Sequence, residues 1–317
     1  MAFFDPAKFT DEAVESLKTE LTDKAIIAAS GGVDSTVAAV LAAKAVGDNL
    51  LAIYVDTGYM RLDESKFVSS MLEDLGVQHK VIDASERFYE GLKGVIDPEE
   101  KRKIIGELFI RVFEEESKKY GGNFLVQGTI APDWIESGGG MRDTIKSHHN
   151  VGGLPDDMEM ELCEPIRELY KDEVRSLAEY LKVSVAQRQP FPGPGLAVRV
   201  MGEATPKRAE IVRQACHIVE DELELAANEG KMELPWQYFA VILPVKTVGV
   251  QGDVRAYGNT IAVRAVQSYD AMTAQALEIP YPVLKKISER ITRELKSEVN
   301  RVVYDITDKP PGTIEWE

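Results

Sequence analysis

The apolar positions in the first part of the chain fall into short runs separated by helix-spaced patterns. The runs, which predict buried strands, cover residues 25–29, 50–55, 78–82 and 124–126. Helical spacing is found over residues 6–23, 36–42 and 65–75, and in a further helix that begins at Asp97-Pro98. Strands that alternate with helices in this way are typical of a parallel sheet with crossover helices. We therefore expect an α/β fold.

The pattern changes at residues 190–195, a stretch of three prolines and two glycines that interrupts both helix and strand. Beyond it, the apolar positions predict strands at 196–201, 238–243, 260–268 and 301–306, and helices at 206–227 and 282–299. This order is typical of an α+β unit. We therefore expect a parallel-sheet domain over residues 1–189 and a smaller α+β domain over residues 190–317.

The junction between the first predicted strand and its helix reads Ser30-Gly31-Gly32-Val33-Asp34-Ser35-Thr36. Adjacent glycines let the backbone pass close to a ligand, and the start of a helix offers unpaired N–H groups to an anion. The lysine of the Walker pattern and the GxGxxG spacing are both missing from the junction. The junction predicts a phosphate-binding loop of another kind, and a strand-to-helix turn without a ligand is the alternative.

Asp56 stands at the end of the second predicted strand. Because the carboxyl ends of parallel strands meet at one edge of the sheet, where ligands collect, we expect Asp56 at the same edge as the loop.

The formal net charge of −16 argues against general nucleic-acid binding. A nucleotide site in such a chain needs local cations. Arg102 lies near the start of the helix at Asp97, where a guanidinium suits a phosphate. For its neighbours Lys101 and Lys103, a phosphate contact and a solvated helix face are both open.

The cysteine content and the apolar runs indicate a cytoplasmic protein. Cys163 and Cys216 are too few for a disulfide framework or a zinc site, and we expect both to be small buried residues. No apolar run approaches the length of a membrane span, and the N-terminal residues lack the layout of a signal peptide.

Beyond the loop, the chain contains several longer motifs. They are Lys101-Arg102-Lys103-Ile104-Ile105-Gly106, Gln127-Gly128-Thr129, residues 145–155 (IKSHHNVGGLP), residues 190–196 (PFPGPGL) and the tail from Arg301 to Glu317. Together with the loop they resemble the GMP synthetase family, from about Lys24 to the last residue. The resemblance implies a pyrophosphatase-loop domain of the adenine-nucleotide alpha-hydrolase type, followed by a dimerisation domain. Gln189 is a departure, since the family usually has histidine there.

The resemblance implies a ligase of purine biosynthesis that makes GMP from XMP, ATP and ammonia through an adenyl-XMP intermediate, with release of AMP and pyrophosphate. The matching ATP and pyrophosphate positions are Ser30, Gly31, Gly32, Val33, Asp34, Ser35, Thr36, Asp56 and Gly128. Asp34 would be catalytic, acting through Mg²⁺ or by ordering the loop. Lys171, and Lys146 in a glycine-flanked stretch expected to form a lid, would add positive charge as catalytic groups.

By similarity, XMP would be held largely by the second domain. The matching positions are Arg102, Gln237, Asp253, Arg301, Lys309 and Glu315. Pro310-Pro311 stiffen the tail, so its side chains are presented at a low entropic cost. Because the family's second domain pairs two subunits, we expect a homodimer.

The source of ammonia is expected to be a second protein. Larger family members carry a glutaminase domain ahead of the synthetase, whereas 29 residues precede Ser30 here, and neither cysteine stands in a nucleophile motif. We therefore expect the ATP-pyrophosphatase subunit of a two-subunit enzyme, partnered by a glutamine amidotransferase. Two alternatives stay open: another adenylating enzyme of the superfamily, such as NAD synthetase or a tRNA-modifying enzyme, and a nucleotide-binding module without chemistry.

Overall fold

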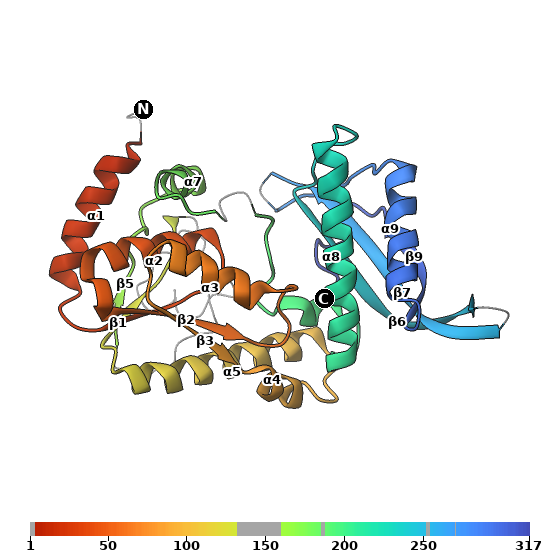
Figure 1. Ribbon diagram of the computed structural model, residues 1–317, viewed down its shortest axis with the longest axis horizontal. Helices are drawn as coiled ribbons and strands as arrows, with labels where there is room; N and C mark the ends of the chain where they lie inside the picture. The colour runs from red at the N-terminus through yellow and green to blue at the C-terminus, as the bar shows by residue number, and fades with distance from the viewer. Residues whose placement is uncertain (1–3, 132–159, 185–187, 252–253, 270) are drawn as a thin grey trace. The chain divides into compact units, whose positions relative to one another are not determined.

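The computed structural model describes residues 4–131, 160–184, 188–251, 254–269 and 271–317 (Figure 1). The described residues form two compact units. The first comprises the residues up to Thr57, Asp63–Ala84 and Gly106–Arg188; the second comprises Gly58–Leu62, Ser85–Ile105 and Gln189–Glu317. The second unit thus takes in two segments that the sequence-based division places within residues 1–189.

The first unit is built on a five-stranded parallel sheet of order β3-β2-β1-β4-β5. Its strands are β1 (Ala25–Ala28), β2 (Leu50–Asp56), β3 (His79–Asp83), β4 (Phe124–Val126) and β5 (Glu161–Cys163). β1 lies at the centre because its Ala-Ile-Ile run can be buried on both faces. The parallel sheet that the alternating pattern predicts is confirmed, with the short β5 as an addition.

Helices cover this sheet. They are α1 (Pro6–Glu20), α2 (Val33–Val46), α3 (Glu64–Asp74) and α7 (Lys171–Tyr180), while α5 (Pro98–Tyr120) runs through residues of both units. α2 packs on β1, β2 and β4, and α1 and α7 pack on α2. Since residues Thr36–Ala42 of α2 are all buried, its small side chains allow close approach to the sheet.

The second unit carries a long antiparallel pair, β6 (Gln237–Gln251) and β7 (Val254–Gln267), with β8 (Gln275–Ala276) antiparallel and β9 (Val299–Asp305) parallel to β7. α8 (Pro206–Asn228) packs against β6, and α9 (Tyr281–Glu294) packs against β9 and α8 (Figure 1). The short helix α4 (Ser85–Gly91) also belongs to this unit. The α+β organisation predicted for this region is confirmed.

One predicted element is wrong: the apolar residues 196–201 do not form a strand but largely the 3-10 helix η3 (Gly195–Arg199). Gly195 turns the chain with φ +64°, and a Cβ there would lie 2.4 Å from the carbonyl oxygen of Tyr59. The N–H of Leu196 donates to that same carbonyl at 2.7 Å. These two contacts with Tyr59 hold the backbone in a turn, so the residues that follow do not adopt an extended conformation.

The final helix ends earlier than its pattern predicts, at Glu294 instead of residue 299. Val299 is buried and pairs with Asn259 as the first residue of β9, so the sheet takes the residues that would prolong the helix. In the described part of the chain, no helix is long and apolar enough to cross a membrane.

Candidate functional site

The loop between β1 and α2 has the backbone shape that its glycines predict. Gly31 has φ +75°, in the left-handed region, and a Cβ there would come 3.0 Å from Cγ2 of Val68 on α3. Gly32 is the N-cap of α2 and makes no side-chain capping bond. The first amides of α2 therefore depend on something other than a side-chain cap, which is the arrangement that suits a bound anion.

Hydroxyl groups order this loop from within. The Oγ atoms of Ser30 and Ser35 lie 2.9 Å apart, and Gly32 N–H donates to Ser30 Oγ at 3.3 Å. The buried Thr36 hydroxyl donates to the Gly32 carbonyl at 2.7 Å. The hydroxyls of Ser30 and Ser35 thus lie together on the accessible side of the turn, while the buried Thr36 hydroxyl fixes its shape. Val33 and Asp34 begin α2, which puts a carboxylate in the first turn.

The loop after β4 lies directly against this turn. A Cβ on Gly128 would meet the carbonyl carbon of Asp34 at 2.7 Å, so only glycine fits there without displacement of α2. The next residue, Thr129, is buried, and its hydroxyl has no hydrogen-bond partner in the described residues. The structure therefore brings Gly128 together with Asp34 and Ser35, as expected for parts of one site.

Asp56 ends β2 at the same edge of the sheet, and its carboxylate accepts a hydrogen bond from Ser65 of α3. The neighbouring Glu64 is buried and forms a bidentate ion pair with Arg188, at 2.8 and 2.6 Å. β1 pairs with β2 on one side and β4 on the other, so the loops after these strands meet where the strand order reverses. Ligands of open α/β sheets bind at such a switch point.

Of the two lysines expected to add positive charge, Lys171 belongs to the described residues and Lys146 does not. Lys171 is exposed at the first position of α7, where Glu173 accepts a hydrogen bond from the Tyr170 amide at 2.9 Å. Lys146, with the whole predicted lid, lies outside the described residues, and so does Asp253. Their expected roles stay predictions.

Two of the expected XMP positions meet in the second unit. Gln237, at the start of β6 and 4% exposed, donates from Nε2 to Glu315 Oε1 at 2.9 Å. Arg199 holds the same carboxylate in two bonds, Nη2 to Oε1 at 2.8 Å and Nε to Oε2 at 3.1 Å. An amide and a fixed carboxylate side by side can recognise the donors and acceptors of a ligand.

Arg102 donates through Nη2 to the main-chain oxygen of Glu317, and its Nε, which lies 3.5 Å from Glu99 Oε1, is buried without a hydrogen bond in the described residues. For Lys101, the solvated helix face that the sequence left open is excluded. Its side chain is 0% exposed and is paired with the Glu317 carboxylate. Burial lowers the pKa of Lys101 below its ordinary value, and the Glu317 carboxylate opposes this.

Arg301 and Lys309 have other neighbours. Arg301 Nε lies 3.4 Å from Thr247 Oγ1 on the sheet, and Lys309 Nζ donates to the carbonyl of Ala271 at 2.8 Å. Within the described part of the chain, neither side chain bonds to Gln237 or Glu315. These two expected XMP positions are therefore not gathered with the other two.

Sequence reasoning missed Arg199 and the contacts of Gln189. Arg199 follows the PFPGPGL motif inside an apolar stretch, and a lone charge in such a stretch is the signal that could have marked it. Gln189 donates to Glu220 on α8 at 2.9 Å and accepts from the Tyr238 amide on β6 at 2.9 Å. Its amide thus joins α8 to β6 beside Gln237.

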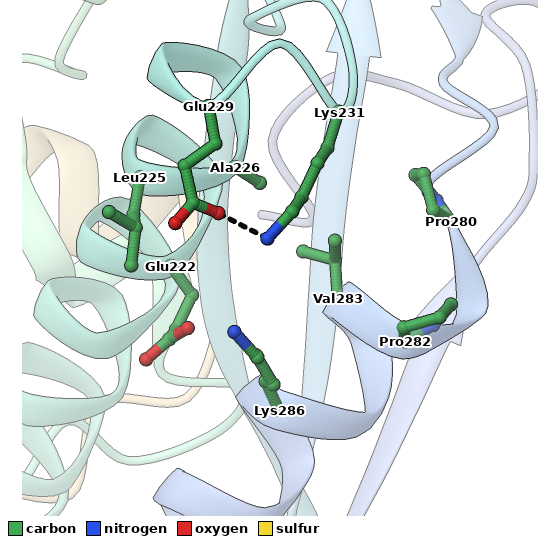
Figure 2. A pocket seen from close by; sticks show the side chains of 9 residues that line it. All are labelled: Glu222, Leu225, Ala226, Glu229, Lys231, Pro280, Pro282, Val283 and Lys286. Atoms are coloured by element: carbon green, nitrogen blue, oxygen red, sulfur yellow. Dashed lines mark hydrogen bonds and ion pairs between the residues drawn. The ribbon is translucent and has the colours of Figure 1, made fainter.

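A separate pocket of about 300 Å³ lies between α8 and the start of α9 (Figure 2). Its apolar lining includes Leu225, Pro282 and Val283, and Lys231 at its rim is paired with Glu229. None of the residues expected to bind ATP or XMP lines it. It is therefore distinct from both candidate sites.

Comparison with known proteins adds two family models. The model "GMP synthase C terminal domain" matches residues 224–316, and the model "NAD synthase" matches residues 7–108. Among solved structures, NMN synthetase from Francisella tularensis is 18% identical, with a TM-score of 0.48 over 73% of this chain and 88% of that one.

Curated relatives match almost the whole chain. A subunit of the glutamine-hydrolyzing GMP synthase is 56% identical in Methanopyrus kandleri and 57% identical in Pyrococcus horikoshii, over 99% of this chain and 100% of each relative. The glutamine-hydrolyzing GMP synthase of Clostridium botulinum is 54% identical over 98% of this chain and 61% of its own length. On this similarity, carried through both units, the chain belongs to the GMP synthase family.

Proposed function

We propose that this chain catalyses the ATP-dependent amination of XMP to GMP. In the first step the xanthine 2-oxygen bonds to the α-phosphorus of ATP, the α–β anhydride bond breaks, and pyrophosphate leaves. Ammonia then attacks C2, the C2–O bond breaks, and AMP leaves with that oxygen. The observation that carries the proposal is the glycine-turned loop at the sheet's switch point, in a chain similar over its length to GMP synthase subunits.

The loop's task is to hold the departing pyrophosphate. The amides that begin α2 and the hydroxyls of Ser30 and Ser35 would donate to the β- and γ-phosphates, and the helix end favours their charge. Each charge-assisted hydrogen bond contributes roughly 1.5–3 kcal/mol, so several offset the repulsion from a chain of net charge −16. Lys171 and Lys146 would add charge from outside the loop.

The donor set fits Mg²⁺ carried in with the nucleotide. Asp34 supplies one carboxylate beside the loop hydroxyls, and Mg²⁺ in nucleotide enzymes is commonly held by one or two carboxylates together with phosphate oxygens and water. Asp34 would hold the ion, which would neutralise negative charge on the leaving pyrophosphate.

XMP is proposed to bind in the second unit. The Gln237 amide and the Glu315 carboxylate would contact the nucleotide, and Arg102 would meet its phosphate. Asp253, Arg301 and Lys309 are further proposed contacts, on similarity alone.

Ammonia is proposed to come from a separate glutamine amidotransferase subunit. The relatives from Methanopyrus kandleri and Pyrococcus horikoshii are named as one subunit of a glutamine-hydrolysing enzyme, which supports the existence of a second subunit. Burial raises the pKa of the thiols of Cys163 and Cys216, so neither is suited to act as a nucleophile. The free, buried thiols also support a cytoplasmic location.

A homodimer is proposed through the β6–β7 hairpin. Val250, Val254 and Tyr257 are 75%, 70% and 70% exposed near its end, and exposed apolar side chains gathered on one element favour association. The hairpin extends beyond the helices of its own unit (Figure 1).

The test measures AMP and GMP formation by the purified chain with ATP, Mg²⁺ and XMP. We expect turnover with ammonium chloride and none with glutamine. Deamido-NAD⁺ in place of XMP is the matched alternative, since residues 7–108 match the NAD synthase model. AMP release with deamido-NAD⁺ but not with XMP would replace the proposal by NAD synthesis, and ATP binding without AMP release in either case would favour a binding module.

A further inference from the structure

Three cationic side chains in the described part of the second unit are completely buried, and all three bind one segment. Lys101, Arg199 and Arg264 are each 0% exposed. Their partners are groups of residues 305–317, the tail that carries Lys309 and Glu315. A buried cation is costly unless it is paired, so this arrangement ties each of them to a docked tail.

Arg199 fixes the orientation of Glu315. Its guanidinium makes two bonds to the carboxylate and stacks on Phe239, with its Cζ 4.1 Å from the ring centroid. A planar fork bonded at two points leaves the carboxylate one orientation. Gln237 donates to the oxygen that also accepts from Arg199 Nη2, so Glu315 reaches Gln237 in a fixed geometry.

Lys101 holds the end of the described tail. Its ammonium pairs with one carboxylate oxygen of Glu317 and donates to the Val200 carbonyl at 2.8 Å. The other Glu317 oxygen accepts from the Gly202 amide at 2.9 Å. Glu317 is therefore held by a main-chain donor and a buried cation two residues beyond Glu315.

Arg264 binds the chain on both sides of Lys309. Its two terminal nitrogens donate to the carbonyls of Thr307 and Thr313, the latter at 3.0 Å, and it lies 3.3 Å from the Asp305 carboxylate. Asp305 also accepts from the Trp316 indole at 3.1 Å. The segment between the two carbonyls contains Lys309, so one side chain on β7 fixes both ends of the turn that presents it.

We propose that Lys101, Arg199 and Arg264 are positioning residues of the XMP site, which hold residues 305–317 so that Glu315 stays beside Gln237 and the turn that carries Lys309 keeps one geometry. The inference rests on the proposed function. Apolar side chains of similar volume would pack a tail at least as stably as buried ion pairs do. Ion pairs add directional bonds, which is what a carboxylate and an ammonium need in order to meet a ligand.

The test variant is Glu317→Gln, which removes one charge and keeps the side-chain volume. Glu233→Gln is the matched control, because Glu233 is exposed and makes no hydrogen bond or ion pair in the described residues. The full-length chain is used, with XMP and ATP affinities measured by calorimetry and the amides of residues 313–317 followed by hydrogen exchange.

For Glu317→Gln we expect faster exchange in the tail and an XMP Kd raised by about tenfold or more, since the buried Lys101 ammonium then lacks its counter-charge. The Kd for ATP should change less than about twofold, since the ATP loop belongs to the other unit. Lys101→Met combined with Glu317→Leu should slow the exchange in the tail again, because neither charge is left unpaired, but XMP binding should stay weak, because the apolar pair lacks directional bonds. Arg199→Lys, which keeps the charge but loses the fork, should weaken XMP alone.

Unchanged XMP affinity in folded Glu317→Gln would overturn the inference. So would equal losses for XMP and ATP, which indicate a general loss of structure. Absence of XMP binding by the unmodified chain would instead refute the proposed function and this inference with it, whatever the exchange data show of the tail.

Discussion

At the scale of single residues, the backbone conformation of Gly31 determines the shape of the proposed phosphate-binding loop. Its φ of +75° strains any other residue, and an added Cβ would lie 3.0 Å from Cγ2 of Val68, closer than an ordinary contact. The residue pattern alone predicts that a glycine is needed here, because the turn must bring amides to an anion. The identity of the atom that excludes a side chain, a methyl group on α3, depends on packing that the sequence does not reveal.

Gly31→Ala should therefore lower ATP affinity by at least about tenfold, since the strained loop moves its amides away from the phosphates. Gly47→Ala is the control: its φ is also positive, at +55°, yet nothing lies within 4 Å of its added Cβ. That variant should bind ATP normally and lose about 1–3 kcal/mol of stability, because φ +55° with ψ −125° is a conformation that suits glycine. Calorimetric titration with ATP separates the two, and equal affinities would contradict the loop assignment.

Asp34→Asn should reduce kcat by about 100-fold or more, because the variant keeps the side-chain volume but weakens the hold on Mg²⁺ near the leaving pyrophosphate. XMP affinity should be unchanged, since the proposed XMP residues belong to the other unit. Steady-state rates with ammonium chloride and XMP binding by calorimetry test both statements. A variant with normal kcat and weak XMP binding would reverse the roles of the two units.

At the scale of secondary-structure elements, the sheet and most helices could be predicted, because their apolar positions repeat with a clear period. The 3-10 helix at residues 195–199 could not, since it depends on the contact of Gly195 with Tyr59 and on packing against α8 and β6, which are separate in the sequence. The same limit holds at the candidate sites. Gln237 and Glu315 are expected from the family resemblance alone, whereas Arg199, which holds Glu315, is recognisable only from the structure.

One ion cluster joins two elements of the first unit and predicts a pH dependence. Glu116 of α5 accepts hydrogen bonds from Lys119 and, across to β3, from Lys80, and these two cations hold the pKa of its carboxyl below the usual value. A carboxyl whose pKa is lower in the folded state adds stability above its unfolded pKa. That stability is lost as the pH falls through the folded pKa.

Glu116→Gln should cost about 1 kcal/mol at pH 7, a modest amount because the two lysines are largely exposed. The difference from the unmodified chain should shrink as the pH falls below 4.5, the ordinary carboxyl value. Urea unfolding across this range measures the effect, with Glu107→Gln on the exposed side of α5 as the control. A pH-independent difference would mean that packing, not charge, is responsible.

At the scale of the whole molecule, the hairpin predicts an assembly. Val250→Lys with Val254→Lys should shift the mass measured by light scattering from dimer to monomer, because like charges would replace apolar contacts at the proposed interface. Lys285→Glu, an exposed change on α9 outside the hairpin, should leave the mass unaltered. A doubly substituted chain that stays dimeric would place the interface elsewhere.

The noncontiguous second unit also bears on how the gene can be divided. Tyr59 donates to the Ala204 carbonyl at 2.6 Å, and Arg213 donates to the carbonyl of Met60 at 2.9 Å, so residues encoded early complete the later unit. An open reading frame trimmed to codons 190–317 lacks Gly58–Leu62 and Ser85–Ile105, and its product should be insoluble or molten by near-UV circular dichroism. If that product folds by itself, the early segments are dispensable. If it does not, the early part of the gene encodes residues that the core of the later unit requires.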